Sequence, residues 1–83
     1  MSDITLRQLE YFLAALDDGS ITAAARTCSV TQATVSTALN ELERAVGTRL
    51  LVRSRTAGVR PTSAGTALVS RARAMLDLAR EIP

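Results

Sequence analysis

Residues 21–46, ITAAARTCSVTQATVSTALNELERAV, contain two helical patterns separated by a short turn. In the second pattern apolar residues recur at steps of four, three and four, at Val35, Leu39, Leu42 and Val46. This spacing predicts a helix with one narrow apolar face. The other face carries short, uncharged hydrogen-bonding side chains, namely Gln32, Ser36, Thr37 and Asn40. Because amides and hydroxyls can pair with base edges in the DNA major groove, the segment is typical of a helix-turn-helix.

The flanking sequence predicts that this segment belongs to a mainly α, winged domain. Apolar spacing places helices at about 5–17, 21–28, 32–46 and 63–80. Two short strands are expected at 50–52 and 58–60, on either side of a loop at 54–57. We therefore expect a winged helix-turn-helix of three helices and a two-stranded wing over residues 1–61. A long linker helix for dimerisation follows at 62–83 and forms one structural unit with it.

Residues with known helix-end preferences mark the boundaries of these elements. Ser20, Thr31 and Thr62 each precede a helical pattern and are expected to be N-cap residues. Gly19 and Gly47 follow helical patterns and are expected to take the left-handed conformation that ends a helix. Pro61 is expected to break the second strand, because proline has no N–H for a strand ladder.

The composition favours closely packed helices over a sheet sandwich. Apolar residues make up 47% of the 83-residue chain, but Phe and Tyr occur once each, so Ala, Leu and Val must fill the core. Ten basic residues, all arginine, and eight acidic residues give a net charge of +2. Four arginines lie within twelve residues that contain no acid: Arg49, Arg53, Arg55 and Arg60. The expected wing, residues 49–60, is therefore basic and suits contact with DNA phosphates.

The chemistry missing from the sequence excludes several function classes. Without histidine there is no Ser-His-Asp triad and no histidine-ligated metal site, and one cysteine cannot form an internal disulfide. Cys28 is expected to be a small core residue, and Glu41 and Glu43 to be solvated or capping-type charges. The sequence has neither an apolar run near 18 residues nor a signal peptide pattern. We expect a cytoplasmic protein that is not an enzyme and uses no metal or cofactor.

Five motifs in this order resemble the N-terminal domain of LysR-type transcriptional regulators. They are LRQLEYF at 6–12, GSITAAA at 19–25, TQATVS at 31–36, LLVRS at 50–54 and RPTSAG at 60–65. The chain departs from the family at four positions, where Ala33, Thr37, Leu51 and Pro61 replace a common proline, basic residue, phenylalanine and leucine. The resemblance implies sequence-specific binding of double-stranded DNA by a bacterial transcription factor, with residues 32–46 in the major groove. It also implies a C-terminal effector-binding domain that this chain lacks, so we expect a fragment of a longer protein.

Candidate DNA contacts divide into base-reading and backbone sets. Gln32, Ala33 and Thr37 are expected to contact bases, and the resemblance also places a base contact at Gln32. An alternative for Thr37 is a hydrogen bond from its hydroxyl to a carbonyl one turn earlier. The expected contacts to the backbone or minor groove are Thr31, Ser36, Asn40, Arg53 and Arg55. Arg49 and Arg60 fit either DNA contact or a solvated, weakly paired surface position.

The last helix predicts a dimer. Leu68, Ala72, Met75, Ala79 and Ile82 follow the four-three spacing of a coiled-coil seam, and Val69 and Leu76 form a second apolar line. One line can pack on the first helix, which leaves the other for a partner. We expect a homodimer that binds an interrupted palindrome, contact with RNA polymerase through the full-length protein, and no membrane association. The alternative function is a winged helix that binds another protein without sequence-specific DNA binding.

Overall fold

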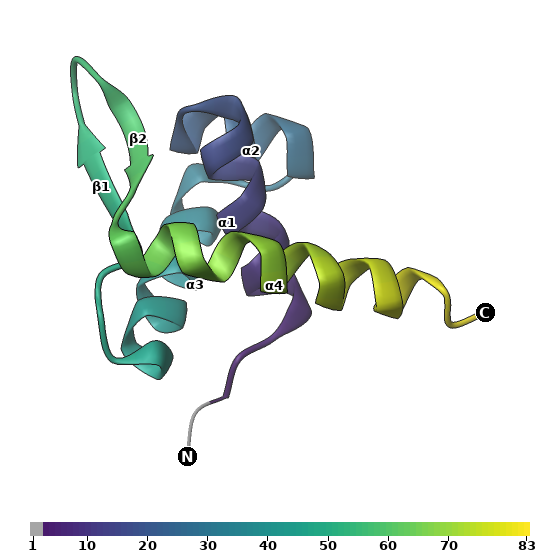
Figure 1. Ribbon diagram of the computed structural model, residues 1–83. Helices are drawn as coiled ribbons and strands as arrows, with labels where there is room; N and C mark the ends of the chain where they lie inside the picture. Colours follow the sequence, from purple (N-terminus) through teal and green to yellow (C-terminus); the bar gives the residue numbers. More distant parts are fainter. Residues whose placement is uncertain (1–2) are drawn as a thin grey trace.

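The computed structural model describes residues 3–83 as four helices and a two-stranded antiparallel sheet (Figure 1). The elements in chain order are α1 (Leu6–Asp18), α2 (Ile21–Cys28), α3 (Gln32–Val46), β1 (Leu51–Ser54), β2 (Gly58–Pro61) and α4 (Ser63–Arg80). This is the order of a winged helix-turn-helix followed by a long helix. The fold class predicted from the sequence is therefore confirmed.

Side-chain caps fix the start of each helix. Thr5 and Gln8 form a capping box at α1, in which each side chain accepts a hydrogen bond from the backbone N–H of the other, at 3.1 and 3.0 Å. The hydroxyl groups of Ser20, Thr31 and Thr62 accept from the backbone of α2, α3 and α4, as predicted. Each such cap stabilises its helix by about 1 kcal/mol.

Left-handed residues end the first three helices. Gly19 has φ 76° after α1 and Gly47 has φ 86° after α3, as the sequence predicts. Ser29, at φ 58°, takes the same conformation in the turn between α2 and α3. A left-handed conformation is strained for a residue with a side chain, and here the packing of the two helices on either side of the short turn maintains it.

The core lies where α1 meets α2, α3, α4 and the base of the wing. Leu9 and Phe12 of α1 are almost fully buried against the apolar face of α3 and the start of the wing, whose buried residues are Val35, Leu39, Leu42, Leu50 and Leu51. Burying one such side chain contributes about 1.5–3 kcal/mol. Val46, the last residue of the predicted apolar face, is exposed at the end of α3, where the chain turns at Gly47.

The wing is tied to the turn between α1 and α2. Its two strands pair in the register Leu51↔Pro61, Val52↔Arg60, Arg53↔Val59 and Ser54↔Gly58. The N–H of Val59 donates to the carbonyl oxygen of Gly19 at 3.0 Å, and a Cβ atom on Gly58 would overlap that oxygen. Pro61 was predicted to break the strand after residue 60, but it is the last residue of β2 and pairs with Leu51, which is possible because a two-stranded sheet has free edges.

Helix α4 packs on α1 through a face different from the one predicted. Ala72 and Leu76 are both buried, although the sequence analysis placed them on separate apolar lines. A helix presents residues four apart to the same neighbour, so the core takes one residue from each line. Leu68 also packs partly against the core, and Ala72 has no exposed surface left for a partner. The assignment of Ala72 to a dimer interface is therefore wrong.

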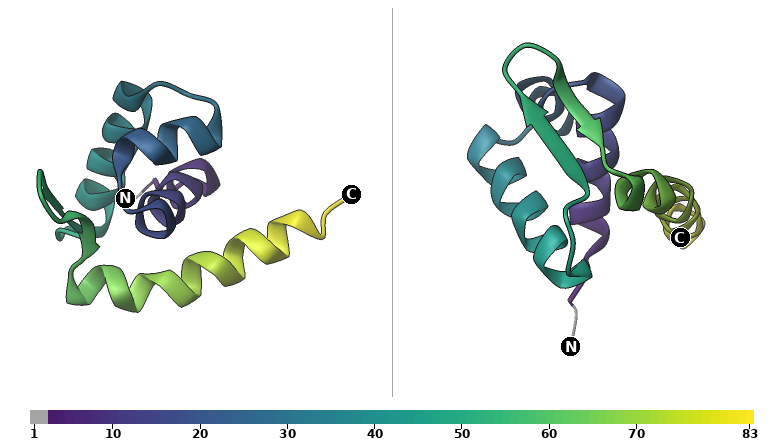
Figure 2. Two further views of the ribbon diagram at one scale, coloured as in Figure 1. Left: turned by 90° about the horizontal axis from the view of Figure 1, so that it is seen from above. Right: turned by 60° about the vertical axis from the view of Figure 1, so that its left-hand side comes forward.

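The far half of α4 leaves the rest of the domain. Figure 2 shows it extending past α1, away from the wing, with the C-terminus at its tip. Met75, Leu78 and Ile82 are exposed there, by 40, 64 and 74%. Met75 and Leu78 lie three positions apart in the helix and share one side of it, roughly a quarter turn from Ala72, and Ile82 follows just beyond the end of α4 at Arg80. Leu78 was not on the predicted line.

Candidate DNA-binding surface

The start of α3 presents an uncharged polar surface to solvent. Thr31 caps the helix by accepting from the N–H of Thr34 at 3.1 Å, and the two hydroxyl groups lie 2.9 Å apart. The exposed side chains of the first turns include Gln32, Ala33 and Thr37. Within residues 3–83, Gln32 and Thr37 use no side-chain atom in a hydrogen bond, so both remain available to a ligand. The predicted base-reading residues therefore lie together at one end of one helix.

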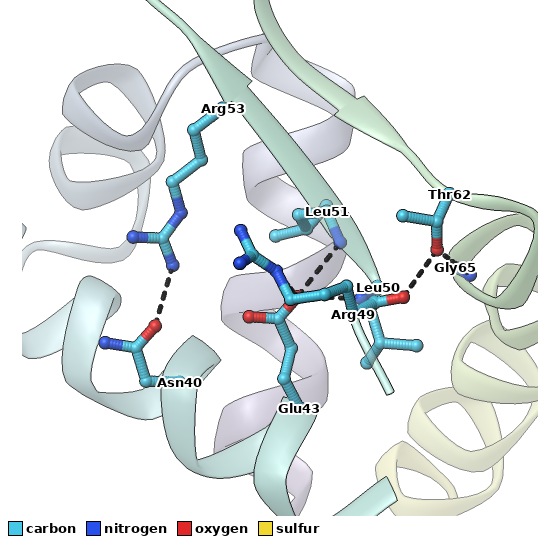
Figure 3. Close-up of polar contacts among 8 residues, drawn as sticks. All are labelled: Asn40, Glu43, Arg49, Leu50, Leu51, Arg53, Thr62 and Gly65. Carbon is cyan, nitrogen blue, oxygen red and sulfur yellow. Dashed lines mark hydrogen bonds and ion pairs between the residues drawn. The ribbon is translucent and has the colours of Figure 1, made fainter. Parts of the chain in front are cut away.

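A hydrogen bond joins the later part of this helix to the wing. Nη2 of Arg53, on β1, donates to Oδ1 of Asn40 at 3.2 Å (Figure 3). Both side chains are exposed, so the pair lies at the surface and the remaining guanidinium donors face outward. The predicted backbone residues Asn40 and Arg53 are thus neighbours, although thirteen positions separate them in the sequence.

The tip of the wing is a tight turn that carries Arg55. The hydroxyl of Ser54 accepts hydrogen bonds from the N–H groups of Thr56 and Ala57, at 3.3 and 3.1 Å. These bonds close the turn around Arg55, whose side chain is exposed. Figure 1 shows this loop between β1 and β2 at the outer end of the wing, away from the helices.

Glu43 fixes the base of the wing to α3. Its Oε2 atom accepts from the N–H groups of Leu50 and Leu51, at 2.7 and 3.2 Å, and lies 3.5 Å from Nε of Arg49 (Figure 3). The Glu43 side chain is only 11% exposed, whereas that of Arg49 is 74% exposed. The prediction that Glu43 is a solvated or merely capping-type charge is therefore wrong: this carboxylate orients the strand that carries Arg53.

Thr62 makes a matching connection to α4. Its hydroxyl donates to the carbonyl oxygen of Arg49 at 2.6 Å and accepts from the N–H of Gly65 at 3.0 Å. The N–H of Thr62 also donates to the carbonyl oxygen of Leu50 at 3.0 Å. Residues 49–51 are consequently held by α3 on one side and by the start of α4 on the other (Figure 3).

Residues 6–66 match the family described as bacterial regulatory helix-turn-helix protein, lysR family. The chain belongs to this LysR family. It is 43% identical over 74 residues to the HTH-type transcriptional regulator TfdS of Cupriavidus pinatubonensis, covering 89% of this chain and 25% of the relative. It is 42% identical over 74 residues to the small neutral protease regulatory protein of Streptomyces coelicolor, covering 89% of this chain and 22% of that protein. The chain thus spans about a quarter of the length of these curated relatives.

Solved structures of LysR-family proteins share the fold. A complex of the CbnR DNA-binding domain with DNA superposes with a TM-score of 0.86 at 39% identity, covering 90% of this chain and 85% of that one. A BenM DNA-binding domain in complex with catB site 1 DNA gives a TM-score of 0.86 at 29% identity, covering 94% and 86%. Full-length OxyR from Pseudomonas aeruginosa gives 0.90 at 31% identity, covering 96% of this chain and 27% of that one.

A second surface of this LysR-family chain is charged, unlike the start of α3. A groove between α1, α2 and the far half of α4 mixes acids and arginines, and an exposed ion pair of 2.8 Å between Asp17 and Arg73 crosses it. Residues 3–83 contain no group of three metal-ligating side chains, and no helix in that range is long and apolar enough to cross a bilayer.

Cys28 is half-buried in this groove and packs against the core, so the predicted core residue lies at the edge of the core. Burial, and then the carboxylates of Glu10 and Asp18, raise the pKa of its thiol. A thiol with a raised pKa is a poor nucleophile at neutral pH, which disfavours a redox role.

The sequence analysis missed the roles of three residues, two where α3 meets the wing and one on the exposed side of α4. Glu43 was missed because its partners are backbone N–H groups, which leave no sequence signal. Leu78 was missed because it lies one residue before Ala79, which continues the regular four-three spacing. Arg44, in the last turn of α3, was passed over because it follows the acidic residues of that helix. Arg44 lies near Arg49 and Arg53 because the chain reverses direction at Gly47, and the sequence alone does not specify that reversal.

Proposed function

We propose that this chain is the DNA-binding part of a LysR-type bacterial transcriptional regulator and binds double-stranded DNA sequence-specifically. The observation that carries this proposal is the exposed, uncharged start of α3, next to a wing whose arginines project from the same domain. Support also comes from the similarity to domains whose structures were determined with DNA. The α3 helix enters the major groove, and residues 49–60 contact the backbone or the minor groove.

The residues divide by the chemistry of their side chains. Gln32 pairs its amide with an adenine, and Ala33 and Thr37 offer methyl groups to thymine. The contacts to the backbone or minor groove are Thr31, Ser36, Asn40, Arg53 and Arg55. A neutral threonine at position 37, where the family often has a charge, gives this chain a base preference of its own.

Dimerisation through α4 doubles the contact surface. One module covers only a few base pairs, so affinity and specificity at an operator call for two copies. The exposed residues available for this seam are Met75, Leu78 and Ile82, with Leu68 and Ala79 at its margins. A two-fold dimer reads an interrupted palindrome, with residues 1–61 on the DNA and residues 62–83 as the linker between the copies.

The longer protein implied by the relatives supplies the remaining activities. An effector-binding domain and contact with RNA polymerase belong to that full-length regulator, which acts in the bacterial cytoplasm. No step proposed for this chain requires a cofactor, a metal or a catalytic group.

Selection of bound duplexes from a random DNA pool tests the proposal. The expected result is an enriched motif made of two inverted half-sites with a fixed spacing. Enrichment of a single half-site would support sequence-specific DNA binding but contradict binding as a two-fold dimer. No enrichment, together with binding of equal strength to every duplex or to none, would favour the protein-interaction alternative.

A further inference from the structure

A notch between α3 and β1 collects three arginines. It is lined by Asn40, Glu43, Arg44, Gly47, Thr48, Arg49 and Arg53, and we refer to it as the arginine notch. Arg44 comes from the last turn of α3, and Arg49 and Arg53 come from the start of the wing. In Figure 3 the guanidinium groups of Arg49 and Arg53 both extend from the wing side toward α3.

The single carboxylate in the notch does not neutralise these charges. Glu43 is turned inward and accepts from two backbone N–H groups, and its contact with Arg49 is a long one, 3.5 Å from Nε. Arg49 is 74% exposed, which leaves its outer guanidinium nitrogens free to bind another group. Among residues 3–83, Arg44 has no ion-pair or hydrogen-bond partner for its side chain. The notch thus holds three cations and one mostly buried anion.

The notch lies on the same side of α3 as two of the base-reading residues, Ala33 and Thr37. Ala33, Thr37, Asn40 and Arg44 follow one another at steps of four, three and four, so they share one helix face. Arg44 is eleven residues after Ala33, which is about 16 Å along the helix at 1.5 Å per residue. The major groove is about 12 Å wide. A helix that reads bases with its first turns therefore brings its last turn to one of the strands that border the groove.

We propose that the arginine notch binds a backbone phosphate of the operator, flanking the bases read by the first turns of α3. This inference rests on the proposed function and adds Arg44 and Arg49 to the DNA-contacting residues. Guanidinium groups pair with phosphate through two parallel N–H donors, and two of them facing one anion give a strong charge-assisted site. The hydrogen bond from Arg53 to Asn40 keeps the third arginine at the rim, where it can reach the neighbouring phosphate.

A purely structural role for these arginines makes different predictions. Arg44 in the last turn of α3 interacts favourably with the helix dipole, and Arg49 with Glu43. Either role would change stability on substitution, but neither would depend on the charge of one DNA linkage. The test therefore combines substitutions in the protein with neutral methylphosphonate linkages in the DNA.

The experiment compares wild type with the double variant Arg44→Gln/Arg49→Gln on the duplex selected from the random pool. The double variant is expected to bind at least about tenfold more weakly. The slope of log K against log salt concentration should be shallower by about 0.9 for each phosphate that the protein no longer neutralises. Arg71→Gln/Arg80→Gln, which also removes two positive charges but from exposed positions of α4, is the matched control and should leave the slope unchanged.

The position of the bound phosphate is found by scanning the duplex with single methylphosphonates. One linkage in each half-site should weaken binding of wild type but not of the double variant. Arg44→Lys/Arg49→Lys should restore the salt slope, and thermal unfolding checks that every variant is folded. An unchanged slope with the same methylphosphonate profile in wild type and double variant would overturn the notch while leaving DNA binding intact. If no duplex can be selected, the proposed DNA-binding function is overturned, and the proposal that the notch binds an operator phosphate is overturned with it.

Discussion

The carboxylate of Glu43 accepts a 2.7 Å hydrogen bond from the backbone N–H of Leu50 and so joins the recognition helix to the wing. The same oxygen accepts from Leu51 at 3.2 Å. The two bonds fix where β1 begins, and β1 carries the arginine that meets Asn40 on α3. The geometry between the base-reading residues and the wing thus depends on a side chain that touches no DNA in our proposal.

Removing this carboxylate should destabilise the domain. Glu43→Ala leaves two backbone donors without their partner, at a cost of about 2 kcal/mol in the free energy of unfolding. Glu43→Gln keeps one acceptor oxygen and should lose roughly half as much. Urea unfolding measures both values. Glu41→Ala, at an exposed position on the same helix, is the control and should stay within about 0.5 kcal/mol of wild type. Equal effects at positions 41 and 43 would contradict the role assigned to Glu43.

Gly65 allows α4 to approach the wing closely. A Cβ atom there would overlap the backbone carbonyl oxygen of Leu50, which cannot move away because Thr62 donates to it. Although alanine normally favours a helix over glycine, Gly65→Ala should destabilise the protein by about 1–3 kcal/mol. Ser70→Ala, exposed on the same helix, should have little effect. A Gly65→Ala protein with a raised Tm would show that the two segments can separate at no cost.

The exposed side of α4 should carry the dimer contact. Met75→Glu and Leu78→Glu each place a charge in that seam and should yield monomers in sedimentation, because a buried, unpaired carboxylate is costly. Ser70→Glu introduces the same charge on a different side of α4 and should remain dimeric. Dimers that persist in both seam variants would mean that the copies meet elsewhere.

The thiol of Cys28 should react slowly. Its raised pKa reduces the thiolate fraction at pH 8, so alkylation by iodoacetamide is expected to be slower in the folded protein than in urea. The folded state holds this proton more tightly than the unfolded state. The free energy of unfolding should therefore fall as the pH rises above the thiol's ordinary value of about 8.5. Faster alkylation of the folded protein would contradict a thiol that is partly buried beside the carboxylates of Glu10 and Asp18.

The sequence predicted the helices well because their ends are marked locally. Ser20, Thr31 and Thr62 cap helices through hydrogen bonds to residues three positions later, so the signal lies within one turn of chain. The burial of α4 was not predictable in the same way. Ala72 and Met75 lie on the same predicted apolar line, and only the direction in which α4 crosses α1 decides that the first is buried and the second exposed.

The candidate site was likewise predictable where local helix geometry determines it and unpredictable where contacts between distant segments do. Ala33 and Thr37 could be placed on one exposed face because they lie four positions apart, and helical periodicity alone determines that. The pairing of Asn40 with Arg53 and the inward turn of Glu43 depend on contacts between α3 and a strand that follows a chain reversal. Such contacts depend on the geometry of the turn, which residue types and spacing do not specify.

Base reading by the start of α3 is the central claim, and the discrimination ratio of Gln32→Ala tests it most directly. The measurement compares the affinity of wild type and variant for the selected duplex and for a duplex of scrambled sequence at one salt concentration. Removal of a bidentate amide pairing should weaken binding to the selected duplex about tenfold or more, and binding to the scrambled duplex less than about twofold. An equal loss on both duplexes would contradict the claim that Gln32 reads the sequence.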